Sequence, residues 1–242
     1  MDYFVKVDEF NIRYLKLGNG NNLVFLHGIW NYSKTYMKLL KGLSKKYTVY
    51  ALDFPGFGKT NRPNTVWMYE DYAEFLYKFV KKLNLDKFVL VGHSGSGGIA
   101  IMFASKYPRL IRKLVLIDSV GVQEKISFFT FVRVILIKTF REMFSFRGLI
   151  ALRLTLFSFL NNFFRNGFYI FKVIKKNKDL NLDDYIKKIK INTLLLWGEK
   201  DEYFPLSHAE KFKDLLNNSE LRIVRGNHDW CLIYPEKIKE FL

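Results

Sequence analysis

This chain of 242 residues is poor in cysteine and histidine, and it has no long uncharged run. Its single cysteine, Cys231, excludes an intrachain disulfide, so nothing indicates an oxidising compartment. The 4 histidines and the scattered acids near 199–202 form no metal-ligand spacing, so we expect no metal. No stretch of about 18 residues is free of charge, which predicts no membrane-spanning helix. The first residues alternate like a strand and lack the apolar segment of a signal peptide, so we expect a soluble, cytoplasmic protein.

Acidic residues are also scarce relative to basic ones, and the formal net charge is +16. Such a charge is typical of proteins that meet nucleic acid, anionic membranes or acidic ligands. The chain has no zinc spacing, no aromatic RNA-binding signature and no basic region leading into heptads, so we expect no nucleic-acid partner. It also has no phosphate-binding loop and no dinucleotide fingerprint, and we expect no cofactor. The simplest interpretation of the charge is a lysine-rich, solvated surface.

Apolar runs alternate with helix-like segments over most of the chain. Period-two alternation at the start of the chain predicts two half-exposed, antiparallel edge strands. Continuous apolar runs, typical of strands buried on both faces, occupy 23–26, 49–52, 89–91, 114–117 and 194–197. Apolar residues at helical spacing predict helices over 66–83, 97–107 and 206–217. The pattern predicts an α/β fold with a doubly wound, mostly parallel sheet flanked by helices, which binds ligands beyond the carboxyl ends of its strands.

One region interrupts this alternation. Residues 128–171 hold 12 of the 24 phenylalanines, and residues 125–178 hold 11 Lys or Arg but one acid, Glu142. We expect a helical cap inserted at 122–185 over the strand ends of a core formed by 1–121 and 186–242. Broad apolar faces with narrow basic stripes suit packing onto the core, but they also suit peripheral contact with anionic lipid. An exposed apolar face of the cap would also suit a homodimer.

The strongest local signal is a serine at the end of a buried strand, in Gly92-His93-Ser94-Gly95. A serine on a tight turn between a strand and a helix is held with its Oγ exposed, and small neighbours are needed to avoid collisions across the turn. The amides at the helix N-terminus then point toward a developing oxyanion. The competing interpretation is a serine that merely forms the turn or caps the helix.

Five motifs in chain order resemble the α/β-hydrolase family. They are His27-Gly28 after a strand, the glycine-rich turn at 53–58, Gly92-His93-Ser94, the loop 198–201, and Asn227-His228 followed by Pro235-Glu236. The resemblance implies that Ser94 is the nucleophile, His228 the base and Asp201 the acid, in the family's chain order. It further implies an oxyanion hole made of the backbone N–H groups of Gly95 and of Ile29 or Trp30, and structural roles for His27 and His93.

Some assignments stay open on the sequence alone. Ser96 stands where the family pattern has its second glycine, so it is a rival nucleophile, although Ser94 fits the strand context better. Asp118 ends another predicted strand and is a rival acid. His208 falls in a predicted helix, and we expect it to face solvent. The aromatic residues Trp30 and Tyr32 either line the substrate pocket or lie on the surface.

The favoured function is an esterase-like serine hydrolase that acts through an acyl-enzyme. A phenylalanine-rich cap predicts a small ester substrate with an apolar acyl or aryl group. The triad alone does not separate esters from thioesters, lactones or C–C bonds. Two alternatives are a membrane-surface lipase and a receptor-like binding protein on a hydrolase scaffold with little turnover. Epoxide- or haloalkane-cleaving relatives use an aspartate where this chain has Ser94, and this disfavours their chemistry.

Overall fold

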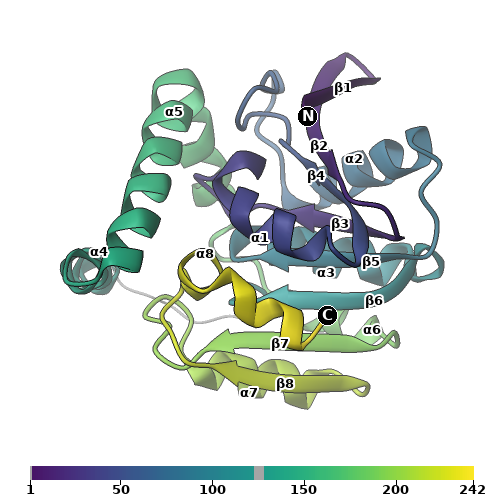
Figure 1. Ribbon diagram of the computed structural model, residues 1–242. Coiled ribbons are helices and arrows are strands. Elements are labelled where there is room, and N and C mark those ends of the chain that lie inside the picture. The colour runs from purple at the N-terminus through teal and green to yellow at the C-terminus, as the bar shows by residue number, and fades with distance from the viewer. Residues whose placement is uncertain (1, 123–127) are drawn as a thin grey trace.

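The computed structural model describes residues 2–122 and 128–242, and it contains one eight-stranded sheet (Figure 1). The strand order is β1-β2-β4-β3-β5-β6-β7-β8. The strands are β1 Asp2–Val7, β2 Phe10–Leu17, β3 Asn21–Leu26, β4 Tyr47–Leu52, β5 Phe88–His93, β6 Ile111–Ile117, β7 Thr193–Gly198 and β8 Ser219–Val224. β2 pairs antiparallel with β1 and β4, and every other pair is parallel. The predicted doubly wound sheet with an antiparallel edge is confirmed.

Helices cover both faces of this sheet. The helices in the described residues are α1 Met37–Leu43, α2 Tyr69–Lys82, α3 Gly95–Lys106, α4 Phe128–Met143, α5 Phe146–Asn177, α6 Asp183–Lys188, α7 Leu206–Leu215 and α8 Trp230–Ile233, with 3-10 turns η1 Ser33–Tyr36, η2 Pro108–Leu110 and η3 Pro235–Glu240. One apolar core joins the sheet to α2, α3, α6 and α7, and the other joins it to α1, α8 and η3. Successive side chains of β5 and β7 enter opposite cores, which is why these strands read as continuous apolar runs.

A buried ion pair ties the antiparallel edge to the loops at the carboxyl ends of the strands. Arg13 on β2 is fully buried and donates to both carboxylate oxygens of Asp53 at 3.2 and 3.0 Å, to the Ser33 hydroxyl at 2.7 Å and to Asp2 at 2.9 Å. Asp53 also accepts from the Ser33 hydroxyl at 2.6 Å and from the amide of Lys59 at 3.2 Å. The alternation of apolar and polar residues in this strand did not indicate the ion pair, because it predicted that Arg13 would lie on the solvent side of a half-exposed edge strand.

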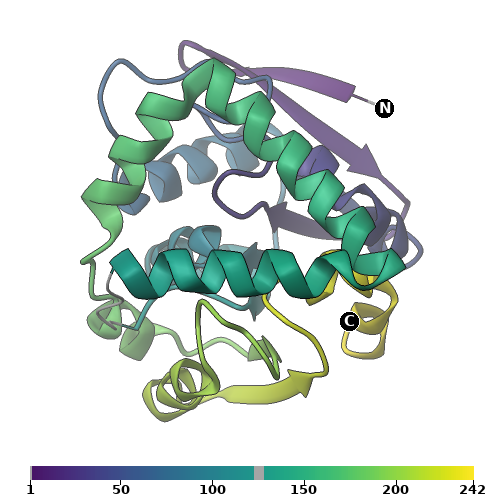
Figure 2. The same cartoon turned by 90° about the vertical axis from the view of Figure 1, so that its left-hand side faces the viewer.

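Helices α4 and α5, which belong to the expected insertion and which we call the cap helices, lie between β6 and β7 in the chain. They stand beside the carboxyl ends of the strands, and the two arms of α5 form a triangle with α4 (Figure 2). The arms meet at Asn166, whose φ of −145° and ψ of 20° are not helical. Residues 123–127 of the expected insertion, and some α4 side chains, lie outside the described residues. Among the described helices, none is long and apolar enough to cross a membrane.

Candidate active site

Ser94 occupies a strained turn between β5 and α3. Its φ of 54° and ψ of −128° lie where side chains other than glycine are disfavoured. The surrounding backbone holds it there, since its amide donates to the Ile117 carbonyl at 2.9 Å and its carbonyl accepts from Gly97 at 2.9 Å and from Val120 at 3.2 Å. This is the geometry of a serine that presents Oγ at the end of a sheet.

The structure brings Ser94, His228 and Asp201 together. His228 lies on the loop after β8, with Nε2 at 3.0 Å from the Ser94 Oγ and Nδ1 at 2.8 Å from the Asp201 Oδ2. The other oxygen of Asp201 accepts from the amides of Tyr203 at 2.8 Å and Phe204 at 3.0 Å, which fixes the carboxylate. With its proton on Nδ1, the imidazole can accept the serine proton on Nε2.

His93, one residue before Ser94, contacts both the ring and the backbone carbonyl of His228. Its Nδ1 lies 2.8 Å from the Tyr36 hydroxyl, its Nε2 lies 3.3 Å from the His228 carbonyl oxygen, and the two imidazole rings are 5.1 Å apart. Burial, and then the neighbouring His228, lower the pKa of His93 to about 4. His93 is therefore neutral near pH 7 and adds no positive charge beside the ring that must accept a proton.

His27 supports the segment after β3. Its Nδ1 lies 3.0 Å from the Gly28 carbonyl, and its Nε2 accepts from the Phe54 amide at 3.4 Å. Burial lowers its pKa, so the ring is neutral and can bridge the loops after β3 and β4.

Asp201, and not Asp118, accepts the bond from His228 Nδ1. Asp118 ends β6, is fully buried, and accepts from the Gly198 amide at 2.7 Å. Burial, followed by the charge of Asp201, raises its pKa well above the ordinary value. Asp118 is thus suited to remaining a neutral acid next to Asp201.

Three buried side chains could geometrically hold a metal ion, since ligand atoms of His93, Asp118 and His228 all lie within 4.8 Å of one another. All four imidazole nitrogens, however, already have hydrogen-bond partners: Tyr36 and the His228 carbonyl for one ring, Ser94 and Asp201 for the other. A metal at this point would have to displace the bonds that align the site.

The expected oxyanion segments meet beside Ser94. Gly95 is the first residue of α3, where the amide has no acceptor within the helix. A Cβ at Gly95 would lie 2.6 Å from the Ile29 Cδ1, and a Cβ at Gly28 would lie 3.4 Å from the Ser94 Cβ. The Ile29 side chain therefore packs against Gly95, and the segment after β3 lies next to Ser94.

Ser96 is buried, with 2% of its surface exposed, and its hydroxyl donates to the carbonyl oxygen of His27. The residue thus binds the start of α3 to the segment after β3. A hydrogen bond between these two segments is a physical reason for serine in place of glycine, and no motif in the sequence indicated it.

The remaining predicted residues lie around this centre. Trp30 packs under α5, with ring centroids 4.8 Å from Phe159 and 4.9 Å from Phe171. Tyr32 precedes η1 and lies over the glycine-rich turn, since a Cβ at Gly58 would be 3.0 Å from its Cβ. The expectation for His208 was wrong, because only 2% of it is exposed.

His208 lies on the inner side of α7 together with Ala209 and Phe212. Its ring packs edge-on against Phe204, with the centroids 5.6 Å apart.

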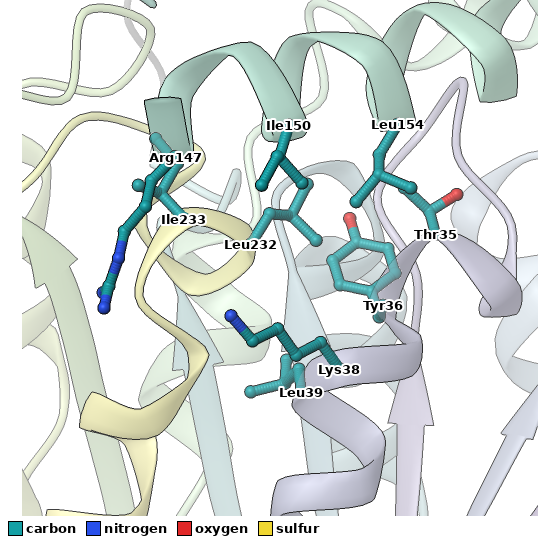
Figure 3. A pocket seen from close by; sticks show the side chains of 9 residues that line it. All are labelled: Thr35, Tyr36, Lys38, Leu39, Arg147, Ile150, Leu154, Leu232 and Ile233. Carbon is teal, nitrogen blue, oxygen red and sulfur yellow. The ribbon is translucent and has the colours of Figure 1, made fainter. Parts of the chain in front are cut away.

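Two hollows border the first turns of α5. Figure 3 shows a small one of about 40 Å³ between α5, α1 and α8, in which Ile150 and Leu154 face Leu232 and Leu39. The other, of about 430 Å³, lies between the α4–α5 corner and the loop after β8. Ser94 lines neither of the two. Both hollows are therefore lined in part by α5, and neither one contains Ser94.

Comparison with known proteins agrees with the fold. The profile of the alpha/beta hydrolase fold family matches residues 21–233, and the chain belongs to this family. An uncharacterised protein of Mycobacterium tuberculosis is 30% identical over 110 residues, which are 46% of this chain and 32% of that protein. The chain thus spans about a third of the length of that relative.

Two further similarities extend over nearly the whole chain. The 2-hydroxy-6-oxo-6-(2'-aminophenyl)hexa-2,4-dienoic acid hydrolase of Metapseudomonas resinovorans is 25% identical over 253 residues, covering 98% of this chain and 87% of that enzyme. The crystal structure of a membrane phospholipase A, described as a bacterial virulence factor, has a TM-score of 0.84 at 25% identity and covers 100% of this chain and 84% of that one.

Proposed function

We propose that the protein is a serine hydrolase that cleaves a carboxylic ester with an apolar acyl or aryl group. The observation that carries the proposal is the relay from Asp201 through His228 to Ser94, with bonds of 2.8 and 3.0 Å, on a strained turn. A serine that merely formed a turn would not require an aligned imidazole and carboxylate.

In the proposed reaction, Ser94 Oγ attacks the ester carbonyl carbon while its proton passes to His228 Nε2. The N–H groups of Gly95 and Ile29 hold the resulting oxyanion, and each such donor is typically worth about 10²- to 10³-fold in rate. The tetrahedral intermediate collapses, the C–O bond to the alcohol breaks, and His228 protonates the leaving alcohol. Water then attacks the acyl-enzyme with His228 again as base, releasing the acid and restoring Ser94.

An apolar acyl group is supported by the aromatic residues where the cap meets the strand ends. Trp30 follows Ile29, one of the proposed oxyanion donors, and is enclosed by Phe159 and Phe171. Such a cluster binds hydrocarbon well and offers few polar partners. The phospholipase A neighbour favours an ester, whereas the dienoic acid hydrolase makes a carbon–carbon bond the second candidate.

The test measures turnover of p-nitrophenyl esters of rising acyl length. Turnover of a 2-hydroxy-6-oxo-hexa-2,4-dienoic acid is measured in parallel. We expect Ser94→Ala to lose roughly 10³-fold or more of kcat. The matched variant Ser96→Ala should stay within about tenfold, since it loses one hydrogen bond worth about 1 kcal/mol. A fluorophosphonate should label Ser94 in the wild type. No ester turnover and no label would refute the proposal and favour a receptor-like binder.

A further inference from the structure

Helix α5 packs on the rest of the protein with its small and polar side. Gly148, Ala151, Ser158 and Asn162 recur every three to seven residues and are all buried. Ser158 donates to the Trp30 carbonyl at 3.2 Å, and Asn162 donates to the same oxygen at 2.8 Å. Asn162 also accepts from the Gly58 amide at 2.9 Å. The first arm of α5 is therefore held largely by hydrogen bonds and close backbone approach.

The opposite side of α5 is aromatic and faces outward. Phe146, Phe157 and Phe164 are 80%, 64% and 80% exposed, and their spacing of 11 and 7 residues places them on one line along the helix. This arrangement is the reverse of the ordinary amphipathic helix, whose apolar side faces the core. Burying the small side while exposing the phenylalanines cannot be explained by the hydrophobic effect within this chain.

The corner between α4 and α5 extends the same surface. Phe140, Met143 and Phe144 are 66%, 55% and 74% exposed and adjoin Phe146. A contiguous apolar surface of this kind is rare on a protein that remains alone in water, and it marks an interaction surface. We call the outward residues of α4 and α5, from Leu136 to Phe168, the outer cap face.

Cations surround the outer cap face, and the sequence has no acid between residues 143 and 178. Arg153 and Arg165 are exposed along α5. At the corner, the hollow of about 430 Å³ is lined by the cations Arg141, Lys200, Arg225 and Lys237, together with one acid, Glu142, and the N-terminal turn of α5. Arg141 is paired there with Glu202 at 2.6 Å. Apolar side chains bordered by cations match a bilayer whose headgroups are anionic.

We propose that the outer cap face docks on an anionic phospholipid bilayer, with its phenylalanines among the upper acyl chains and its cations at the headgroup phosphates. A second copy of this chain fits less well, because two such faces would bring cations against cations. The docking goes beyond the hydrolase proposal and does not depend on it, although α5 also contacts the loop that carries Ile29 through the Trp30 carbonyl.

The test is flotation of the full-length Ser94→Ala protein with vesicles, so that no lipid is consumed during the measurement. Vesicles of phosphatidylcholine alone are compared with vesicles containing phosphatidylglycerol, at low and high salt. We expect binding to the anionic vesicles that weakens with salt. Phe157→Gln with Phe164→Gln should lower the partition coefficient roughly tenfold or more. The matched pair Phe4→Gln with Ile223→Gln, exposed on β1 and β8, should stay within about twofold.

The cations are tested separately with Arg153→Gln and Arg165→Gln. Each should weaken binding to anionic vesicles about fivefold and leave phosphatidylcholine unaffected. Failure of the parent protein to float with either vesicle would overturn the proposal. So would light scattering that shows a dimer which the phenylalanine variants convert to a monomer, since the face would then bind protein. Ester turnover by the wild type decides the hydrolase proposal independently.

Discussion

Helix α2 and the first arm of α5 turn opposite sides toward solvent: α2 exposes its polar side, and α5 exposes its apolar side. In α2, Phe75, Leu76 and Phe79 are buried against the sheet while Lys78 lies outside. In the first arm of α5, small and polar residues are buried and the phenylalanines lie outside. In α2 the apolar side packs in the core, and in the first arm of α5 it lies outside, whereas the second arm of α5 packs Tyr169, Ile170 and Val173 into the core.

The difference separates two uses of phenylalanine in one chain. In α2, each ring removed from water contributes to the free energy of folding. On the first arm of α5, the exposed rings contribute little to folding, and this arm is held by the bonds of Ser158 and Asn162 to the loops after β3 and β4. Substitutions on the two helices should therefore differ in the size of their effect on stability, and these differences test the comparison.

The largest expected effect is on the inner side of α2. Phe79→Ala should lower the free energy of unfolding by about 3–5 kcal/mol, because the fully buried ring, packed edge-on against Tyr14, leaves a cavity. Urea unfolding measures the change. Its outward neighbour Lys78 forms only an exposed ion pair with Asp8, so Lys78→Ala should cost less than about 1 kcal/mol. Equal costs would show that α2 is not packed as described.

A buried polar group of the core should give a pH-dependent effect. Because the pKa of His93 is lowered to about 4, the unfolded chain binds this proton first as the pH falls. The contribution of neutral His93 to the free energy of unfolding is fully present above the ordinary pKa of about 6.5. It amounts to roughly 3 kcal/mol and is lost as the pH falls toward about 4. Chemical unfolding across this window should show a steeper slope for the wild type than for His93→Gln. Identical slopes would contradict the assignment.

A smaller effect is expected on the inner side of α5. Asn162→Ala removes the partner of the Gly58 amide and one of the two donors to the Trp30 carbonyl, which keeps Ser158, and should cost about 1–3 kcal/mol. The adjacent Asn161, which is only partly buried, supplies the control: Asn161→Ala should change stability by less than about 0.5 kcal/mol. If the two variants unfold at the same urea concentration, α5 is not held by these bonds.

The smallest effect on folding should come from the outer cap face. Phe164, 80% exposed, leaves almost no cavity, so Phe164→Ala should alter the free energy of unfolding by less than about 0.5 kcal/mol. Thermal or urea unfolding in the absence of lipid is the measurement. A loss like that of Phe79→Ala would mean that the ring is buried in the protein itself, and the contrast between the helices would disappear.

Much of this fold could be predicted from residue order alone. Runs such as 89–91 and 194–197 are apolar on consecutive residues because successive side chains enter two different cores. The turn after β5 and the loop after β7 follow such runs directly, and the loop after the half-exposed β8 carries His228, so Ser94, Asp201 and His228 could be proposed as a set.

Other features depend on contacts between distant segments and left no local signal. Arg13 is buried because Asp53, 40 positions away, compensates its charge. His208 was expected in solvent because helical spacing gives the sides of a helix but not which side meets the sheet. For α5 the same ambiguity is greater, since hydrophobicity alone predicts the wrong side as the buried one.

The proposed triad is assembled from segments that the chain supplies at very different times. Ser94 and His228 are 134 positions apart, with the whole cap between them. A ribosome therefore finishes the nucleophile strand and both cap helices before it adds the base, and a growing chain holds an unactivated serine. Closing contacts of such long range is slow, so in refolding the hydrolytic rate should return after local helix formation. Catalysis would then report the last stage of assembly, when β7 and β8 join the edge of the sheet.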